Sequence, residues 1–145
     1  MSVTVFVEMT SHDDITSTVR KHYPNVQAVY LFGSYGTERQ WPNSDVDVAL
    51  LLPAEEAWNA QPLALSPCRF ALEARLRRPV DLINLRHVST VFQNEITNTG
   101  RGLVAPDAEA MHAFEMRVLS AYQKLNEERR EILEEFFRSK RAYEL

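Results

Sequence analysis

The chain has 145 residues, 45% of them hydrophobic and 25% charged, which is the size and balance of one globular domain and argues against disorder. Its 16 Lys and Arg against 20 Asp and Glu give a net charge of −4, so we expect no direct binding to nucleic acid. The single Cys68, the absence of any run long enough to span a membrane and an N-terminus unlike a signal peptide predict a cytoplasmic protein.

The first part of the chain predicts one helix and two strands. Residues 2–8 alternate between apolar and small polar residues, which favours a short strand or a loosely ordered extension. We expect a helix over 11–22, capped by Ser11 and ended by Pro24. Two β-rich runs follow, at 26–32 and 46–52, with a loop of turn-forming residues between them.

The remainder predicts helices around a further strand. In chain order we expect an interrupted helix over 55–76, a strand over 80–85, a helix over 89–98, a short run over 103–105 and a long helix over 107–141. The last helix carries one apolar stripe at intervals of three, four and seven residues, namely Met111, Phe114, Val118, Tyr122, Leu125, Ile132 and Phe136. The stripe indicates either packing on the chain's own sheet or docking of a helical partner.

This element order predicts an α/β (α+β) fold with a small mixed β-sheet and helices packed on it. No linker divides the chain, so we expect one domain over 1–145, with a core over about 11–106 and a C-terminal helix over about 107–141.

The motif that indicates chemistry is Gly33-Ser34, followed after ten residues by Asp45-Val46-Asp47. If the strand begins at or before Asp45, both carboxylates leave the same face of the sheet, where they repel each other unless a cation lies between them. Oxygen ligands favour Mg²⁺, with Mn²⁺ as an alternative, and such an ion also binds substrate phosphates. Gly33 lets the backbone approach a phosphate, and Ser34 offers it an N–H and a hydroxyl.

A third carboxylate, Asp81, opens the strand after Pro79. If that strand lies beside the second, Asp81 faces the same cleft, as a metal ligand or as the base that accepts the proton of an attacking hydroxyl. The same residues also have purely structural explanations. Asp45 and Asp47 can be solvated strand-end residues, and Gly33 can serve a turn alone.

The run LFGSYGTERQWPNSDVDVALLL resembles the nucleotidyltransferase fold of the DNA polymerase β superfamily, and most of all its minimal nucleotidyltransferase (MNT) members. PVDLINL is similar to their third-carboxylate strand, and LRHVSTVFQNEITNTGRGLV to their next helix and closing strand. The resemblance covers about residues 25–105. The size and long last helix are most similar to the MntA-like antitoxins of HEPN/MNT toxin–antitoxin pairs.

The resemblance implies an antitoxin that transfers AMP from ATP to a tyrosine of a partner HEPN ribonuclease. It implies that Gly33 and Ser34 hold the triphosphate. Asp45 and Asp47 then bind Mg²⁺, and Asp81 joins one metal and activates the acceptor. Many relatives read Gly-Ser-aromatic-Ala-Arg-Gly, whereas in this chain the first basic residue comes later, at Arg39, which is therefore only a candidate phosphate contact.

Two other functions stay open. A binding antitoxin would block the toxin by contact alone, which the long helix favours. A nucleotidyltransferase for a small molecule usually carries an added acceptor-binding domain, for which 145 residues leave little room.

Overall fold

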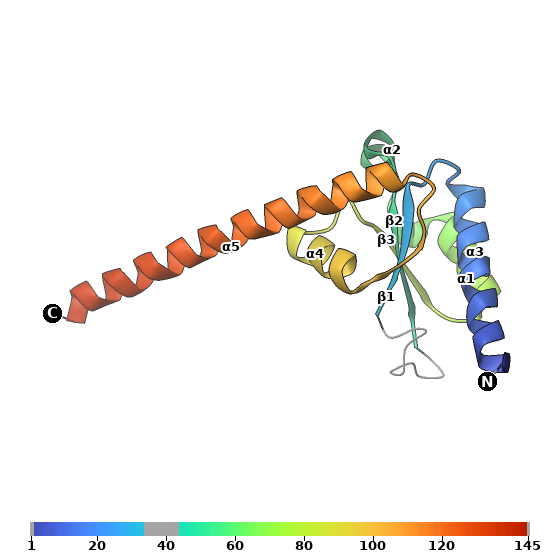
Figure 1. The fold of residues 1–145 in the computed structure, drawn as a ribbon, viewed down its shortest axis with the longest axis horizontal. Helices are drawn as coiled ribbons and strands as arrows, with labels where there is room; N and C mark the ends of the chain where they lie inside the picture. The colour runs from blue at the N-terminus through green and yellow to red at the C-terminus, as the bar shows by residue number, and fades with distance from the viewer. Residues whose placement is uncertain (1, 34–43, 145) are drawn as a thin grey trace.

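The structure is a computed structural model that describes residues 2–33 and 44–144, with side chains described over 11–33 and 44–140. Its elements in chain order are α1 (Ser2–His22), β1 (Ala28–Phe32), β2 (Val46–Leu51), α2 (Ala54–Asn59), the 3₁₀ turn η1 (Leu63–Leu65), α3 (Pro67–Leu76), β3 (Val80–Asn84), α4 (Thr90–Thr99), β4 (Arg101–Val104) and α5 (Ala108–Glu144) (Figure 1). The strands and helices expected from residue 26 onward are confirmed, with their ends shifted by a few residues.

The strands form one mixed sheet in the order β3-β2-β1-β4. β1 pairs antiparallel with β2 and with β4, whereas β2 and β3 run parallel. Parallel neighbours need a crossover connection, which α2, η1 and α3 supply. The small mixed sheet with helices packed on it is thus confirmed, and the strand of Asp81 lies beside the strand of Asp47.

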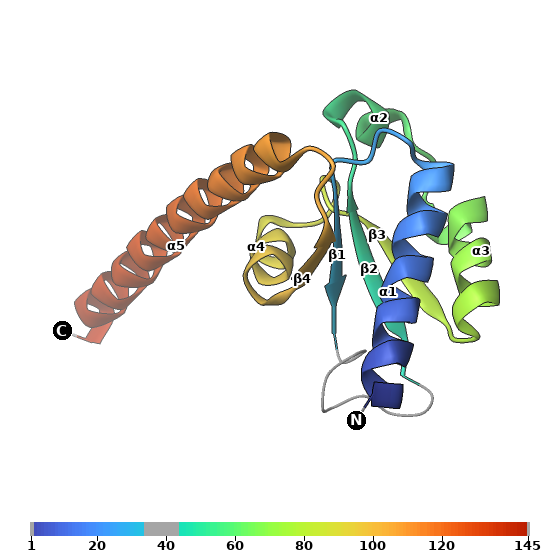
Figure 2. The same cartoon turned by 45° about the vertical axis from the view of Figure 1, so that its right-hand side comes forward.

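Helices cover both faces of the sheet, with α1 and α3 on one side and α4 and the start of α5 on the other (Figure 2). Alternate residues of β2 feed two separate cores, because successive side chains of a strand point to opposite faces. Val46, Val48 and Leu50 pack with the α1 and α3 side chains. Ala49 and Leu51 belong to the second core, which includes Ile96 of α4.

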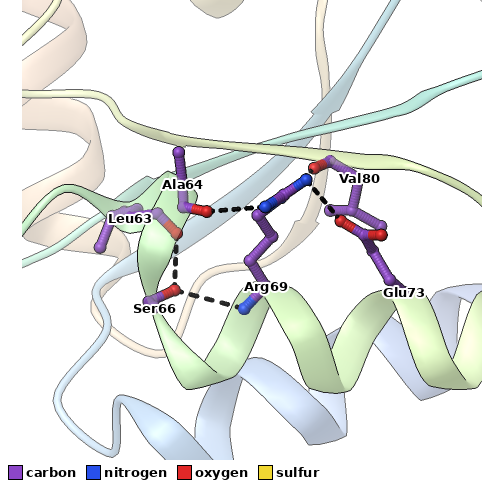
Figure 3. Close-up of polar contacts among 6 residues, drawn as sticks. All are labelled: Leu63, Ala64, Ser66, Arg69, Glu73 and Val80. Carbon is purple, nitrogen blue, oxygen red and sulfur yellow. Dashed lines mark hydrogen bonds and ion pairs between the residues drawn. The ribbon is translucent and has the colours of Figure 1, made fainter.

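Arg69 of α3 fastens the crossover to the outer edge of β3 (Figure 3). Its guanidinium donates to the carbonyl oxygens of Val80 at 3.0 Å and Ala64 at 2.8 Å, and it pairs with Glu73 at 2.8 Å. Ser66 caps the same helix by accepting a bond from the Arg69 N–H at 3.2 Å. These bonds fix the first residue of β3, which directly precedes Asp81.

The expectation for residues 2–8 is wrong, because they belong to helix α1, which runs without a break from Ser2 to His22. Ser11 therefore lies inside the helix and does not cap it. A lone strand at this position would have no neighbour for its backbone, whereas a helix satisfies its hydrogen bonds within the segment. The predicted end before Pro24 is confirmed.

Helix α5 has 37 residues and behaves differently along its length. Phe114 and Val118 are buried in the second core, and Tyr30 donates a 2.6 Å hydrogen bond to Glu115. Every described residue from 126 to 140 is exposed, and this part stands clear of the body (Figure 1). No helix within the described ranges combines the length and apolarity that crossing a membrane requires.

Candidate active site

The site lies where β1 ends and β2 begins. Phe32, the last residue of β1, is paired with Asp47 of β2, and the chain then turns at Gly33, whose φ is +76°. A β-carbon at position 33 would lie 2.2 Å from Asp47 Oδ2. Glycine is therefore required for two reasons, the left-handed backbone and the carboxylate resting against its α-carbon.

The parallel register of β2 and β3 brings the second and third carboxylates together. Asp47 and Asp81 are direct partners in the ladder, so both side chains leave the same face of the sheet. That face is the one covered elsewhere by α4 and α5, because Asp47 alternates with Val46 and Val48 of the opposite core. Asp45 is exposed immediately before β2.

The charges of this cluster act on Asp47 most strongly. Its burial, followed by the neighbouring charges of Asp81 and then Asp45, raises the pKa of Asp47 from 3.8 to about 6. Both causes disfavour the ionised carboxylate. The shift indicates that Asp81 and Asp45 lie near enough to act on Asp47, whereas the metal site expected from these residues stays a prediction.

The donor set suits a hard divalent cation, since it consists of carboxylate oxygens at the mouth of a sheet. In the described parts of the chain, no three His, Cys, Asp or Glu side chains are gathered tightly enough to enclose a metal ion. Asp45, Asp47 and Asp81 are the carboxylates of this region, and their role as metal ligands stays a prediction.

Two further contacts around the carboxylates were not predicted from the sequence. Arg78, just before β3, donates to the Ser44 carbonyl oxygen at 3.4 Å and so links the starts of β2 and β3. Phe92 of α4 meets the half-buried Phe32 edge to face, with ring centroids 5.7 Å apart. Both are tertiary contacts between segments far apart in the chain, so no local sequence pattern indicates them.

Two predicted site residues lie outside the described part of the chain. Ser34 and Arg39 belong to the segment 34–43, so their roles stay predictions. Cys68 is buried in the α1–α3 core, as expected for a small apolar side chain.

Comparison with protein families identifies the family of this chain. The family described as "Polymerase beta, Nucleotidyltransferase" matches residues 13–109, which run from within α1 to the start of α5 and include all three carboxylates. The chain belongs to the polymerase beta nucleotidyltransferase family. The resemblance seen in the Gly33-Ser34 and Asp45-Asp47 motif is thereby confirmed.

Individual relatives show which kinds of nucleotidyltransferase this chain is similar to. It is 31% identical over 129 residues to the protein adenylyltransferase MntA of Shewanella oneidensis, which covers 89% of each chain. A crystal structure of a toxin–antitoxin with AMP-PNP matches with a TM-score of 0.66 at 30% identity, covering 87% of this chain and 98% of the other. The tri-AMPylated Shewanella oneidensis HEPN toxin in complex with its MNT antitoxin matches with a TM-score of 0.64 at 28% identity, over 89% and 98%.

Proposed function

We propose that this nucleotidyltransferase is a cytoplasmic antitoxin that moves AMP from ATP onto a tyrosine hydroxyl of a HEPN ribonuclease toxin and so neutralises it. One observation carries the proposal: the parallel register sets Asp47 beside Asp81, while the Asp47 carboxylate rests on the α-carbon of Gly33. A phosphate held at Gly33 would therefore lie next to the carboxylates. The similarity to an adenylyltransferase and to complexes with toxins supports the substrate and the partner.

The transfer is a displacement at the α-phosphorus of ATP. The acceptor oxygen forms a bond to that phosphorus, the bond to the bridging oxygen of the β-phosphate breaks, and pyrophosphate leaves. Gly33 and Ser34 bind the triphosphate in this proposal, and Arg39 is a further phosphate contact. Asp45, Asp47 and Asp81 would hold Mg²⁺ or Mn²⁺, which would neutralise the charge that develops on the phosphates.

Asp81 is the residue best placed to receive the proton of the acceptor hydroxyl. It is exposed and lies on β3, an edge strand of the sheet, whereas Asp47 lies on the inner strand β2. A tyrosine on the surface of another protein can approach an edge strand without entering the body. A carboxylate within hydrogen-bond reach of that hydroxyl then acts as its base.

The test is transfer from α-labelled ATP with Mg²⁺ to the product of the adjacent gene, a HEPN toxin under this proposal. Wild-type protein should label the partner, and EDTA should abolish the label. The double variant Asp45→Asn, Asp47→Asn should lose transfer while it keeps its fold and its complex with the partner. Unchanged labelling by that variant would rule out the carboxylates as the catalytic groups.

A binding antitoxin remains the second candidate, because the outer part of α5, residues 126–140, exposes four large apolar side chains. Co-expression of the partner with the same double variant separates the two functions. If catalysis neutralises the toxin, growth should fail with the variant. Full protection by the variant at normal expression would show that contact alone is sufficient.

A further inference from the structure

The outer part of α5 presents an apolar surface that nothing in the described chain covers. We define this outer face by four residues, Ile132 (67% exposed), Leu133 (55%), Phe136 (60%) and Phe137 (55%). They fall within two helical turns, and the two phenyl rings meet edge to face at 5.7 Å. Exposed apolar side chains that gather in this way mark an interaction site, whereas single ones are ordinary.

The outer face continues the face of α5 that packs on the sheet. Phe114, Val118, Leu125, Ile132 and Phe136 follow one another at intervals of four or seven residues. At 100° per residue these intervals keep side chains within a narrow sector of a helix. Because Phe114 and Val118 are buried against the sheet, Ile132 and Phe136 point to the same side as the sheet itself.

Charge divides the two sides of this outer part. With the same 100° periodicity, Arg129 and Lys140 lie within the sector of the outer face. Glu127, Glu131 and Glu134 lie on the opposite side together with Arg138, whereas Glu128 and Glu135, four residues before and three after Ile132, border the outer face. The outer face is therefore apolar with charges of both signs at its border, and the back of the helix suits water.

The outer part cannot draw its stability from the body. Its 15 described residues from 126 to 140 are all exposed and correspond to about 22 Å of helix. Most helical stability in proteins comes from tertiary packing of an apolar face, so packing of this face against another molecule would stabilise the outer part.

The outer part of α5 lies on the same side of the sheet as the carboxylates. α5 leaves the body on the α4 side of the sheet, and in both views it slants back toward the level at which β1 ends and β2 begins (Figures 1 and 2). Asp47 and Asp81 face that same side. A protein resting on the outer face is thus held on the side of the sheet from which the acceptor must reach Asp81.

We infer that the outer face of α5 is the docking surface for the HEPN toxin and that it delivers the acceptor tyrosine to the carboxylates. This inference rests on the proposed function for the identity of the partner, and the neighbouring structures named as toxin–antitoxin complexes support a toxin over a second copy of this chain. Docking on the helix contributes to binding the toxin. The chemistry stays with Asp45, Asp47 and Asp81.

The test uses the full-length protein with Ile132→Gln plus Phe136→Gln, which keeps helix formers and removes the apolar face. The matched control is Glu127→Gln plus Glu131→Gln, with the same spacing on the opposite side. Each protein is titrated with the unmodified toxin, and transfer rates are measured against toxin concentration. The apolar variant should raise Kd and KM for the toxin by about tenfold or more, as removal of two central anchors does. Its kcat at saturating toxin and its affinity for AMP-PNP should match wild type, and the control should match throughout.

Failure of this inference is distinct from failure of the proposed function. An unchanged Kd in the Ile132 and Phe136 variant would overturn the docking surface, and so would the absence of any complex with wild type. A wild-type dimer that becomes a monomer in the variant, with toxin binding intact, would overturn it in favour of a second copy. If the complex depends on the outer face but no AMP is transferred, the docking surface stands and the proposed enzymatic activity is refuted.

Discussion

The Asp47 carboxylate combines burial with two like-charged neighbours. Its raised pKa of about 6 means that ionisation costs free energy in the folded protein until a cation shares the charge. Under the proposed function, the same arrangement that destabilises the metal-free fold would favour binding of a divalent ion. Arg78 holds the starts of the two strands together at this point.

Asp47→Asn should stabilise the metal-free protein at about pH 7.5, by on the order of 1–3 kcal/mol, while abolishing transfer. The folded pKa of about 6 lies above the unfolded value of 3.8, so the folded state binds more protons between these values. Stability from this group thus rises as pH falls through 6, so the advantage of Asn should fall to about a third near pH 4.5 and vanish only below the unfolded pKa of 3.8. Thermal unfolding in EDTA at both pH values, with the exposed Asp13→Asn as control, measures this. An equal advantage at both pH values would contradict the pKa assignment.

Gly33→Ala should cost about 1–3 kcal/mol of stability and lower the transfer rate at least about tenfold. The new methyl group would meet Asp47 Oδ2 at 2.2 Å on a backbone with φ of +76°, so the carboxylate must move. Gly102→Ala is the matched control, because its β-carbon meets only the flexible end of Met111 at 3.3 Å. Chemical denaturation and the transfer assay give both quantities. Wild-type activity in Gly33→Ala would show that Asp47 does not need its position.

Part of the site could be predicted from residue spacing. The turn residues after Phe32 predict a loop, but the period of a strand places Asp45 and Asp47 on one face only if the strand includes Asp45, and β2 begins at Val46. The contact between Gly33 and Asp47 and the pairing of Asp47 with Asp81 depend on strand order and register. Strand order and register are set by the packing of the two cores. Residue spacing alone could therefore say only that Asp81 would face the same cleft if its strand lay beside the second strand.

At the scale of elements, α5 joins a packed half to an exposed half. Phe114→Ala should destabilise the isolated chain by about 3–5 kcal/mol, because Phe114 is 5% exposed and its loss leaves a cavity between α5 and the sheet. Phe136→Ala on the same helix should change stability by less than about 0.5 kcal/mol, because Phe136 is 60% exposed. Urea unfolding of both variants without partner checks the pair. A large loss from Phe136→Ala would mean that the outer part already packs on something.

The elements show where sequence patterns succeed and fail. The 3.6-residue stripe correctly predicted one long helix after residue 107, since periodicity over many turns is hard to imitate. It could not say where the stripe stops being buried, because that depends on the size of the sheet beneath it. The alternation over residues 2–8 was misleading. A strand also needs a neighbouring strand with which to pair, and these residues instead belong to the continuous helix α1.

For the whole molecule, the two faces of the sheet divide the work. The α1–α3 side is a closed core of aliphatic residues, whereas the α4–α5 side carries the carboxylates at one end and the start of α5 at the other (Figure 2). The family fold could be predicted from the motif and element order. The fact that α5 and the carboxylates lie on the same side of the sheet could not be predicted, because it depends on the face of the sheet to which each strand residue points.

The central claim is transfer of AMP to a protein partner, and intact-mass spectrometry of the HEPN toxin after incubation with this chain, ATP and Mg²⁺ tests it most directly. The account predicts that the toxin gains mass in steps of one AMP, with no gain in EDTA or with the Asp45→Asn, Asp47→Asn variant. A toxin of unchanged mass that is nevertheless held in a stable, inactive complex would contradict it.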